Sequence, residues 1–159
     1  MGARIFTIFG SFEGDNRRVI SGELVERPGG ETRGYFFETD TYGHRSKRFV
    51  SGYFAKNNRS GKVGFAFFAL SNEFEPMQGL ILDIEEGRPG YWSRQDPLRG
   101  GFERAGDMVL KFKEQEFTIE DSHRIERSCA RLDEAVHANA EYWRLASCTA
   151  DYVRNACAS

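Results

Sequence analysis

The sequence has few cysteines and few prolines. Its 159 residues include four Pro and three Cys, and the cysteines Cys129, Cys148 and Cys157 all lie in the C-terminal segment. An odd number of cysteines confined to one segment is a poor disulfide framework. We therefore expect reduced thiols, and with them a cytoplasmic protein.

Long hydrophobic runs and an excess of one charge are also lacking. No apolar run approaches the ~20 residues that a membrane helix needs, and Thr7, Gly10 and Ser11 interrupt the N-terminal apolar stretch, so we expect no signal peptide. The formal net charge is −2 and the pI is about 6.0. This balance predicts neither a nucleic acid nor a membrane as a partner.

Motifs of catalysis and metal binding are scarce. The sequence has no G-x-S-x-G, no P-loop, no H-E-x-x-H and no C-x-x-C. Two Glu-x-x-His pairs, Glu120/His123 and Glu134/His137, resemble di-iron ligands, but both fall on one predicted helix, whereas a di-iron site draws its ligands from facing helices. We expect no metal and no cofactor. Whether the protein is an enzyme stays open, and the sequence favours a non-catalytic role.

Glycine and phenylalanine, in contrast, are abundant, with 17 Gly and 14 Phe. Stretches of β-type residues alternate with turn sequences such as RPGG, NNRSG and EGRPG, and no helical pattern intervenes. This order predicts an antiparallel meander. The expected strands are 4–13, 17–27, 32–40, 47–56, 61–71, 77–85, a broken strand within 90–104, and 107–117.

A loose repeat of apolar–x–Gly–x–apolar recurs in these strands as IFGSF, ISGEL, VSGYF and MQGLI. Residues two apart share a face of a strand, so the glycines Gly10, Gly22, Gly52 and Gly79 are expected on the inner face. Inward glycines let a sheet curl, and about eight curled strands close into an up-and-down barrel. They either only permit this curvature or also hollow the interior for a ligand, and the sequence leaves both open.

A different periodicity follows Phe117. Apolar residues spaced by three and four predict an amphipathic helix over 118–158, opened by a capping box between Thr118 and Asp121. Such a helix is longer than the barrel is tall, so it either breaks near 147–149 or its overhang packs on a second copy. The strand 61–71 is apolar on both faces, and its outer face is expected to lie under this helix or in a dimer interface.

The longer, more aromatic and more charged loops are expected to gather at one end of the barrel. Arginines beside aromatic rings suit planar anions, and function tends to sit on loops above a rigid barrel. The candidate binding residues at this end are Tyr42, His44, Arg45, Lys47, Tyr91, Trp92, Arg94 and Arg99.

We therefore predict a mainly β protein with a single domain over 1–159, a barrel over 1–117 and a C-terminal helix over 118–158. A curled sheet that grips the helix is the alternative. The meander followed by a helix resembles the calycin group in topology only, because its one Gly-x-Trp, Gly90-Tyr91-Trp92, lies near the seventh strand.

For function, the sequence favours a binding protein for a small, partly apolar, anionic ligand at the long-loop mouth. Two alternatives stay open. One is an interaction module that forms a homodimer, or binds a protein partner, through the helix and strand 61–71. The other is a small barrel enzyme of the isomerase or cyclase type.

Overall fold

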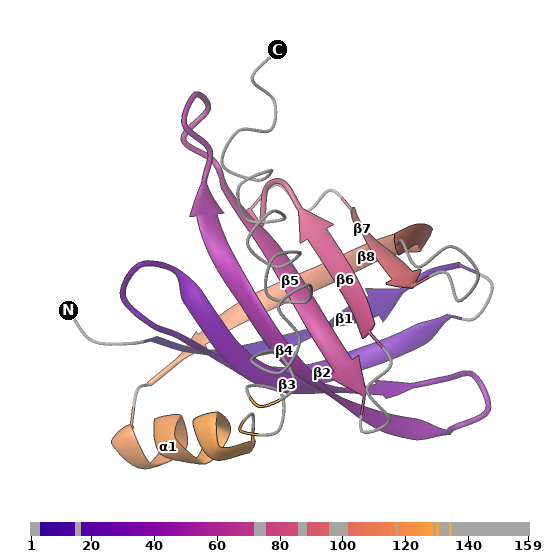
Figure 1. Ribbon diagram of the computed structural model, residues 1–159, viewed down its shortest axis with the longest axis horizontal. Coiled ribbons are helices and arrows are strands. Elements are labelled where there is room, and N and C mark those ends of the chain that lie inside the picture. The colour runs from indigo at the N-terminus through magenta and orange to yellow at the C-terminus, as the bar shows by residue number, and fades with distance from the viewer. Residues whose placement is uncertain are drawn as a thin grey trace.

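The computed structural model describes residues 4–14, 17–71, 76–85, 89–95, 102–116, 118–128, 130 and 134. In these ranges the chain forms a closed antiparallel barrel and one α-helix (Figure 1). The elements are β1 (Arg4–Phe12), β2 (Arg18–Glu26), β3 (Glu31–Thr39), β4 (Arg45–Lys56), β5 (Val63–Ser71), β6 (Pro76–Ile81), β7 (Gly90–Gln95), β8 (Phe102–Gln115) and α1 (Ile119–Ser128).

Each strand pairs with the next along the chain, and β1 pairs with β8 to close the barrel. The predicted eight-stranded up-and-down barrel is therefore confirmed. The alternative of an open sheet gripping the helix is wrong, because the sheet closes on itself. The described helix lies outside it, where Ile125 packs against Ile5 and Val25 on outward faces of β1 and β2 (Figure 1).

Two strand boundaries differ from the prediction by more than three residues. Strand β6 ends at Ile81 rather than at residue 85, because Asp83 accepts a hydrogen bond from the Glu85 backbone N–H, at 3.0 Å, and turns the chain. Strand β8 begins at Phe102, five residues early. It pairs with the whole of β7 through an irregularity between Trp92 and Ser93, where the register moves from Gly106 to Arg104.

The inward glycines alternate with large rings around one belt of the barrel. Across β4 to β8 the register pairs Gly52 with Phe67, Phe67 with Gly79, Gly79 with Trp92, and Trp92 with Gly106. A Cβ added at Gly79 would lie 2.6 Å from Cζ of Phe67. The glycines in this belt make room for neighbouring rings, so they permit the packing and do not hollow the interior.

Strand β5 is buried on both faces, as its sequence predicted. Phe65 and Phe67 point into the barrel, while the outward Phe68 and Leu70 are each only 1% exposed. This outer face is therefore covered within a single chain. The described helix α1 packs on β2 and β3.

The predicted start of the helix is confirmed. The Asp121 backbone N–H donates to Thr118 Oγ1 at 3.1 Å, which is the expected N-terminal cap. Ser122 and Ile125 face the barrel and are buried, while Ile119 and His123 are exposed. The predicted continuation to residue 158, with its break or overhang, lies almost entirely outside the described residues.

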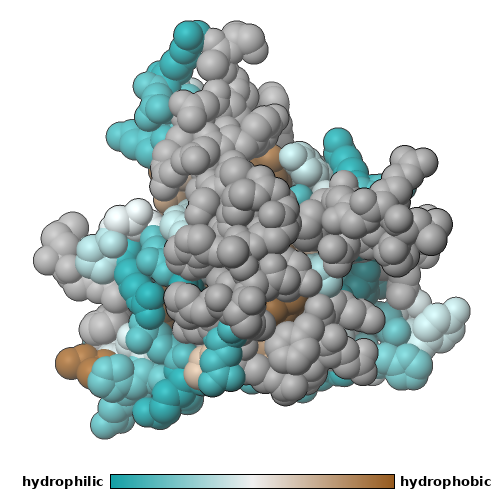
Figure 2. Space-filling view, in the orientation of Figure 1, coloured by the Kyte–Doolittle hydropathy of each residue, from teal (hydrophilic) through white to brown (hydrophobic). Residues whose placement is uncertain are grey.

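Among the described residues, no helix is both long and apolar enough to cross a membrane. In the view of Figure 2, the described surface is mostly hydrophilic, and its hydrophobic areas are small.

Candidate functional site

Three charged side chains point into the barrel at the end where the predicted long loops lie. Arg18 begins β2, Glu38 is near the end of β3, and Arg48 is near the start of β4, so adjacent strands bring them together. The Arg18 Nη1 lies 3.0 Å from Glu38 Oε2, and the Arg48 Nε lies 2.7 Å from Glu38 Oε1. We call these three residues the mouth cluster.

In the mouth cluster, the guanidinium groups of Arg18 and Arg48 both contact the carboxylate of Glu38. The side chains of Glu38, Arg48 and Arg18 are 4%, 10% and 19% exposed. Buried charges of this kind persist only when paired. The Nε of Arg18 is nevertheless buried without a hydrogen-bond partner, which leaves one cationic donor unsatisfied beside Glu38.

Trp92 lies directly beside this cluster. The Arg18 Cζ sits 4.8 Å from the centroid of its indole ring, on the ring face, and Phe12 stacks on the indole at 5.5 Å between centroids. The indole Nε1–H donates to the Glu13 carbonyl oxygen at 3.0 Å, which fixes the ring. An arginine over a tryptophan ring places a cationic hydrogen-bond donor beside an apolar ring, a combination that suits flat anions.

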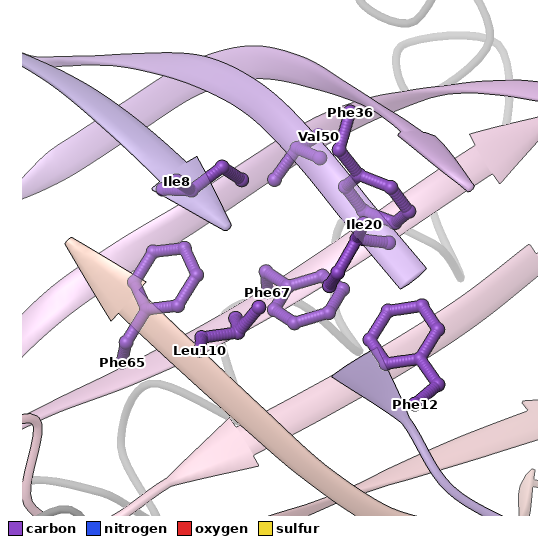
Figure 3. Close-up of a pocket in the computed structure, with 8 residues that line it drawn as sticks. All are labelled: Ile8, Phe12, Ile20, Phe36, Val50, Phe65, Phe67 and Leu110. Carbon is purple, nitrogen blue, oxygen red and sulfur yellow. The ribbon is translucent and has the colours of Figure 1, made fainter. Parts of the chain in front are cut away.

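Below the mouth cluster, apolar side chains fill the interior. Side chains from β1 to β5 and from β8 converge there, namely Ile8, Phe12, Ile20, Phe36, Val50, Phe65, Phe67 and Leu110 (Figure 3). The space between these eight leaves no room even for a water molecule. At the level of these eight residues, the barrel is packed and not hollow.

The first group of predicted site residues lies apart from the mouth cluster, on the β3–β4 hairpin. Tyr42 and His44 are each 84% exposed, and Arg45 points outward and stacks on Phe37, with 3.9 Å between Cζ and the ring centroid. Their backbone is held by Asp40, whose carboxylate accepts the N–H groups of Tyr42 and His44 at 2.9 Å. These two bonds outweigh desolvation and lower the pKa of Asp40.

The second group is on β7, and only one of its members joins the cluster. Trp92 points inward, as described. Tyr91 faces outward beneath Arg104, whose Cζ is 4.8 Å from the ring centroid, and Arg94 is exposed. Arg99 lies outside the described residues. The predicted site thus divides into Trp92 at the mouth, Tyr91 and Arg94 on β7, and an outer group on β3–β4. Which of these bind a ligand stays a prediction.

Sequence reasoning missed Arg18, Glu38 and Arg48. The signal was present in the alternation of each strand, since Arg18 shares a face with Ile20, Glu38 with Phe36, and Arg48 with Val50. Charged residues at strand ends are normally solvated. The alternation alone therefore did not lead to the prediction that these three side chains point into the barrel.

A second charged contact attaches α1 to the barrel wall. Glu23 on the outer face of β2 accepts hydrogen bonds from Arg124 Nη2 at 2.9 Å and from the Tyr35 hydroxyl. Burial alone raises the pKa of Glu23, but these bonds outweigh it, so the pKa lies below its usual value. Burial, together with the bond to Glu23, raises the pKa of Tyr35. The contact holds the helix against the barrel wall.

The other residues considered for metal binding or acid–base catalysis do not form a site among the described residues. Glu120 and His123 are exposed on α1, and Asp83 and Glu85 form a turn after β6. Within the described ranges, no group of three or more His, Cys, Asp or Glu side chains is arranged to hold a metal ion.

Comparison with models of protein families, with curated proteins and with solved structures finds no match for this chain.

Proposed function

We propose that this protein binds a small anion with a flat apolar part at the mouth of its barrel, without catalysing a reaction on it. The anion would bind beside the guanidinium of Arg18. Its apolar part would lie near Trp92. The observation that carries the proposal is Arg18, whose buried Nε has no partner while its guanidinium lies against the Trp92 ring.

The packed interior supports a site at the mouth rather than in the middle of the barrel. Inward phenylalanines occupy the space that an eight-stranded barrel otherwise offers to one small ligand. The incompletely bonded guanidinium of Arg18 supports an anion, because a carboxylate or sulfonate accepts charge-assisted hydrogen bonds from a guanidinium fork. The cluster offers no paired acid and base and no nucleophile, and we therefore favour binding over turnover.

The cellular compartment and the oligomeric state of the protein are also matters of proposal. We propose a cytoplasmic location, on the ground that three cysteines in one segment form no disulfide framework. A homodimer or a protein complex through the C-terminal helix also remains a proposal. It would not use the outward side chains of β5, because a single chain already buries Phe68 and Leu70.

The test is a titration with anilinonaphthalene sulfonate, an apolar planar anion that fluoresces when bound, against the folded protein and two variants. Arg18→Met removes the guanidinium beside Trp92 and keeps an unbranched apolar side chain. Arg17→Met makes the same change one residue earlier, where the side chain is 60% exposed and pairs with Glu13. We expect Arg18→Met to weaken binding about 10-fold or more, as the loss of a charge-assisted hydrogen bond requires.

Arg17→Met is expected to bind the dye like the unchanged protein, with circular dichroism showing that both variants stay folded. Equal weakening in both variants would point to general charge attraction. No weakening in Arg18→Met would remove the mouth cluster from the function.

A further inference from the structure

The outer wall of the barrel carries a second, independent feature across β8, β1, β2, β3 and β4. The register places Lys111 beside Phe9, Phe9 beside Ser21, and then Phe37 and Lys47 in one row. The rows above and below it contain Arg45 with Val19, and Lys113 with Thr7. We call the basic and apolar members the outer basic face, namely Arg45, Lys47, Lys111, Lys113, Phe9, Val19 and Phe37.

The basic side chains of this face are not paired with any carboxylate of the described residues. Within the described part of the chain, Arg45, Lys47, Lys111 and Lys113 make no ion pair, and Arg45 and both β8 lysines are exposed. The one acidic residue in the three rows is Glu23, and Arg124 pairs with it at 2.9 Å. The face therefore has a local positive charge that the net charge of −2 conceals.

Apolar groups are interleaved with these cations and stay open to solvent. Phe9 is 43% exposed and Val19 is 52% exposed. Phe37 carries the Arg45 guanidinium at stacking distance, 3.9 Å from its centroid, and Lys47 Nζ lies 5.8 Å from the same ring. Phe9 thus offers one exposed ring, and Arg45 offers one cation supported by Phe37. Phe37 lies two strands from Phe9 across Ser21, or roughly 10 Å.

We propose that the outer basic face binds single-stranded nucleic acid, with lysines on phosphates and bases stacked on Phe9 and on the Arg45 guanidinium. Bases stack on aromatic rings and on arginine planes whatever their sequence, and cations that follow the backbone supply the rest of the affinity. The net charge led to the opposite expectation, but a net charge averages over all faces and does not report the pattern on one.

The shape and charge of the face disfavour other occupants. A second copy of this chain would bring like charges together. A barrel wall is convex, so a flat membrane would meet only part of it, whereas a flexible strand can follow the curve. An acidic peptide would satisfy the lysines but would leave the exposed Phe9 ring without a planar partner.

The experiment measures fluorescence anisotropy of a labelled oligothymidylate of about 15 nucleotides, a length that spans one site of this size. A duplex of equal length and a poly-glutamate peptide serve as comparisons. With four phosphate contacts, the logarithm of the affinity is expected to fall with the logarithm of salt concentration at a slope of about −2.8. Binding is expected to be tightest for the single strand.

Four variants locate the site. Phe9→Ala is expected to weaken binding about 5- to 100-fold through lost stacking, and Lys111→Glu to make the salt slope shallower by at least about 0.7. The matched controls are Leu82→Ala, which truncates another exposed apolar side chain, 40% exposed, after β6, and Lys56→Glu, which reverses an exposed charge at the opposite end of β4. Both controls are expected to bind as the unchanged protein does.

Several results would overturn the proposal. These are no binding at about 20 mM salt, equal binding of the duplex, tighter binding of the poly-glutamate peptide, or unchanged binding in both Phe9→Ala and Lys111→Glu. Lys111 is exposed, so Lys111→Glu tests binding at the outer basic face even if Phe9→Ala alters the fold. The dye titration at the mouth does not involve these residues, so the two proposals fail separately.

Discussion

Arg18 and Glu38 face each other on the inner wall of the barrel, with 3.0 Å between Nη1 and Oε2, and Arg48 reaches the same carboxylate from the next strand. Two cations on one buried anion close the top of an apolar interior. Because the pairing is enclosed, each member depends on the others far more than an ion pair on the surface would.

Replacing Glu38 with Gln is therefore expected to cost about 3 kcal/mol of the free energy of unfolding, since Arg18 and Arg48 then lose a buried charged acceptor. Urea denaturation measures the change. The triple variant Arg18→Met, Glu38→Leu, Arg48→Met is the control, and its stability is expected near that of the unchanged protein, because it removes every charge at once. A loss within about 0.5 kcal/mol for Glu38→Gln would match an ordinary surface site and contradict the cluster.

Gly79→Ala is expected to destabilise the protein by about 1–3 kcal/mol, because the new methyl group meets the Phe67 ring. Thermal or urea unfolding of Gly79→Ala, Phe67→Leu and the double variant forms a cycle. The smaller leucine is expected to recover part of the loss, so the double variant should cost less than the sum of the two single changes.

Gly22→Ala provides the comparison for this cycle. A Cβ there would meet the backbone of β3, with Phe36 Cα at 2.6 Å, and no side chain can be shortened to relieve it. Strict additivity at Gly79 and Phe67 would show that the glycine does not make room for the ring.

Glu23→Gln is expected to cost about 1–2 kcal/mol at pH 7, because Arg124 and Tyr35 then lose a charged acceptor at a partly exposed site. The pKa of Glu23 is lowered in the folded state, so its contribution is complete above the ordinary value of 4.5 and is lost as pH falls below it. The difference between the two proteins in urea denaturation should therefore shrink below about pH 4.5.

The exposed Glu114 supplies the matching control, since Glu114→Gln is expected to leave stability nearly unchanged at every pH. If the difference between the unchanged protein and Glu23→Gln stayed constant down to pH 3, the charged contact between α1 and β2 would not be present in solution.

Arg94→Ala tests whether the binding surface extends onto β7. Arg94 is exposed, and a solvated arginine contributes about 0.2–1 kcal/mol, so the dye should bind about 1.5- to 5-fold more weakly. The protein should unfold at the same urea concentration as before. Unchanged dye affinity would remove Arg94 from the site and leave the mouth cluster alone.

The alternation of residues along each strand was enough to predict the barrel. Inward glycines at 10, 22, 52 and 79, and a strand such as β5 that is apolar on both faces, specify a closed and covered sheet. The site was harder to predict, because Arg18 and Glu38 are of types that normally face water. Each of these two side chains can be buried because the other, on the neighbouring strand, pairs with its charge. The residue pattern within one strand does not reveal such a pair.

The early start of β8 was missed for a related reason. Residues 102–106 contain Glu103, Arg104 and Gly106, which do not favour a strand. Pairing with β7 extends β8 back to Phe102, because the register change at Trp92 and Ser93 accommodates one extra residue in β8. Contacts between strands outweigh local propensity here.

The most direct test of the site at the mouth is the nitrogen–proton NMR signal of the Trp92 indole during a titration with anilinonaphthalene sulfonate. Trp92→Phe identifies the signal, because Trp143 is the one other tryptophan in the sequence. We predict that the Trp92 signal shifts with a saturating dependence on dye concentration, and that Arg18→Met abolishes the shift. A Trp92 signal that does not move while the dye binds, or one that moves equally in Arg18→Met, would contradict an anion site beside Arg18.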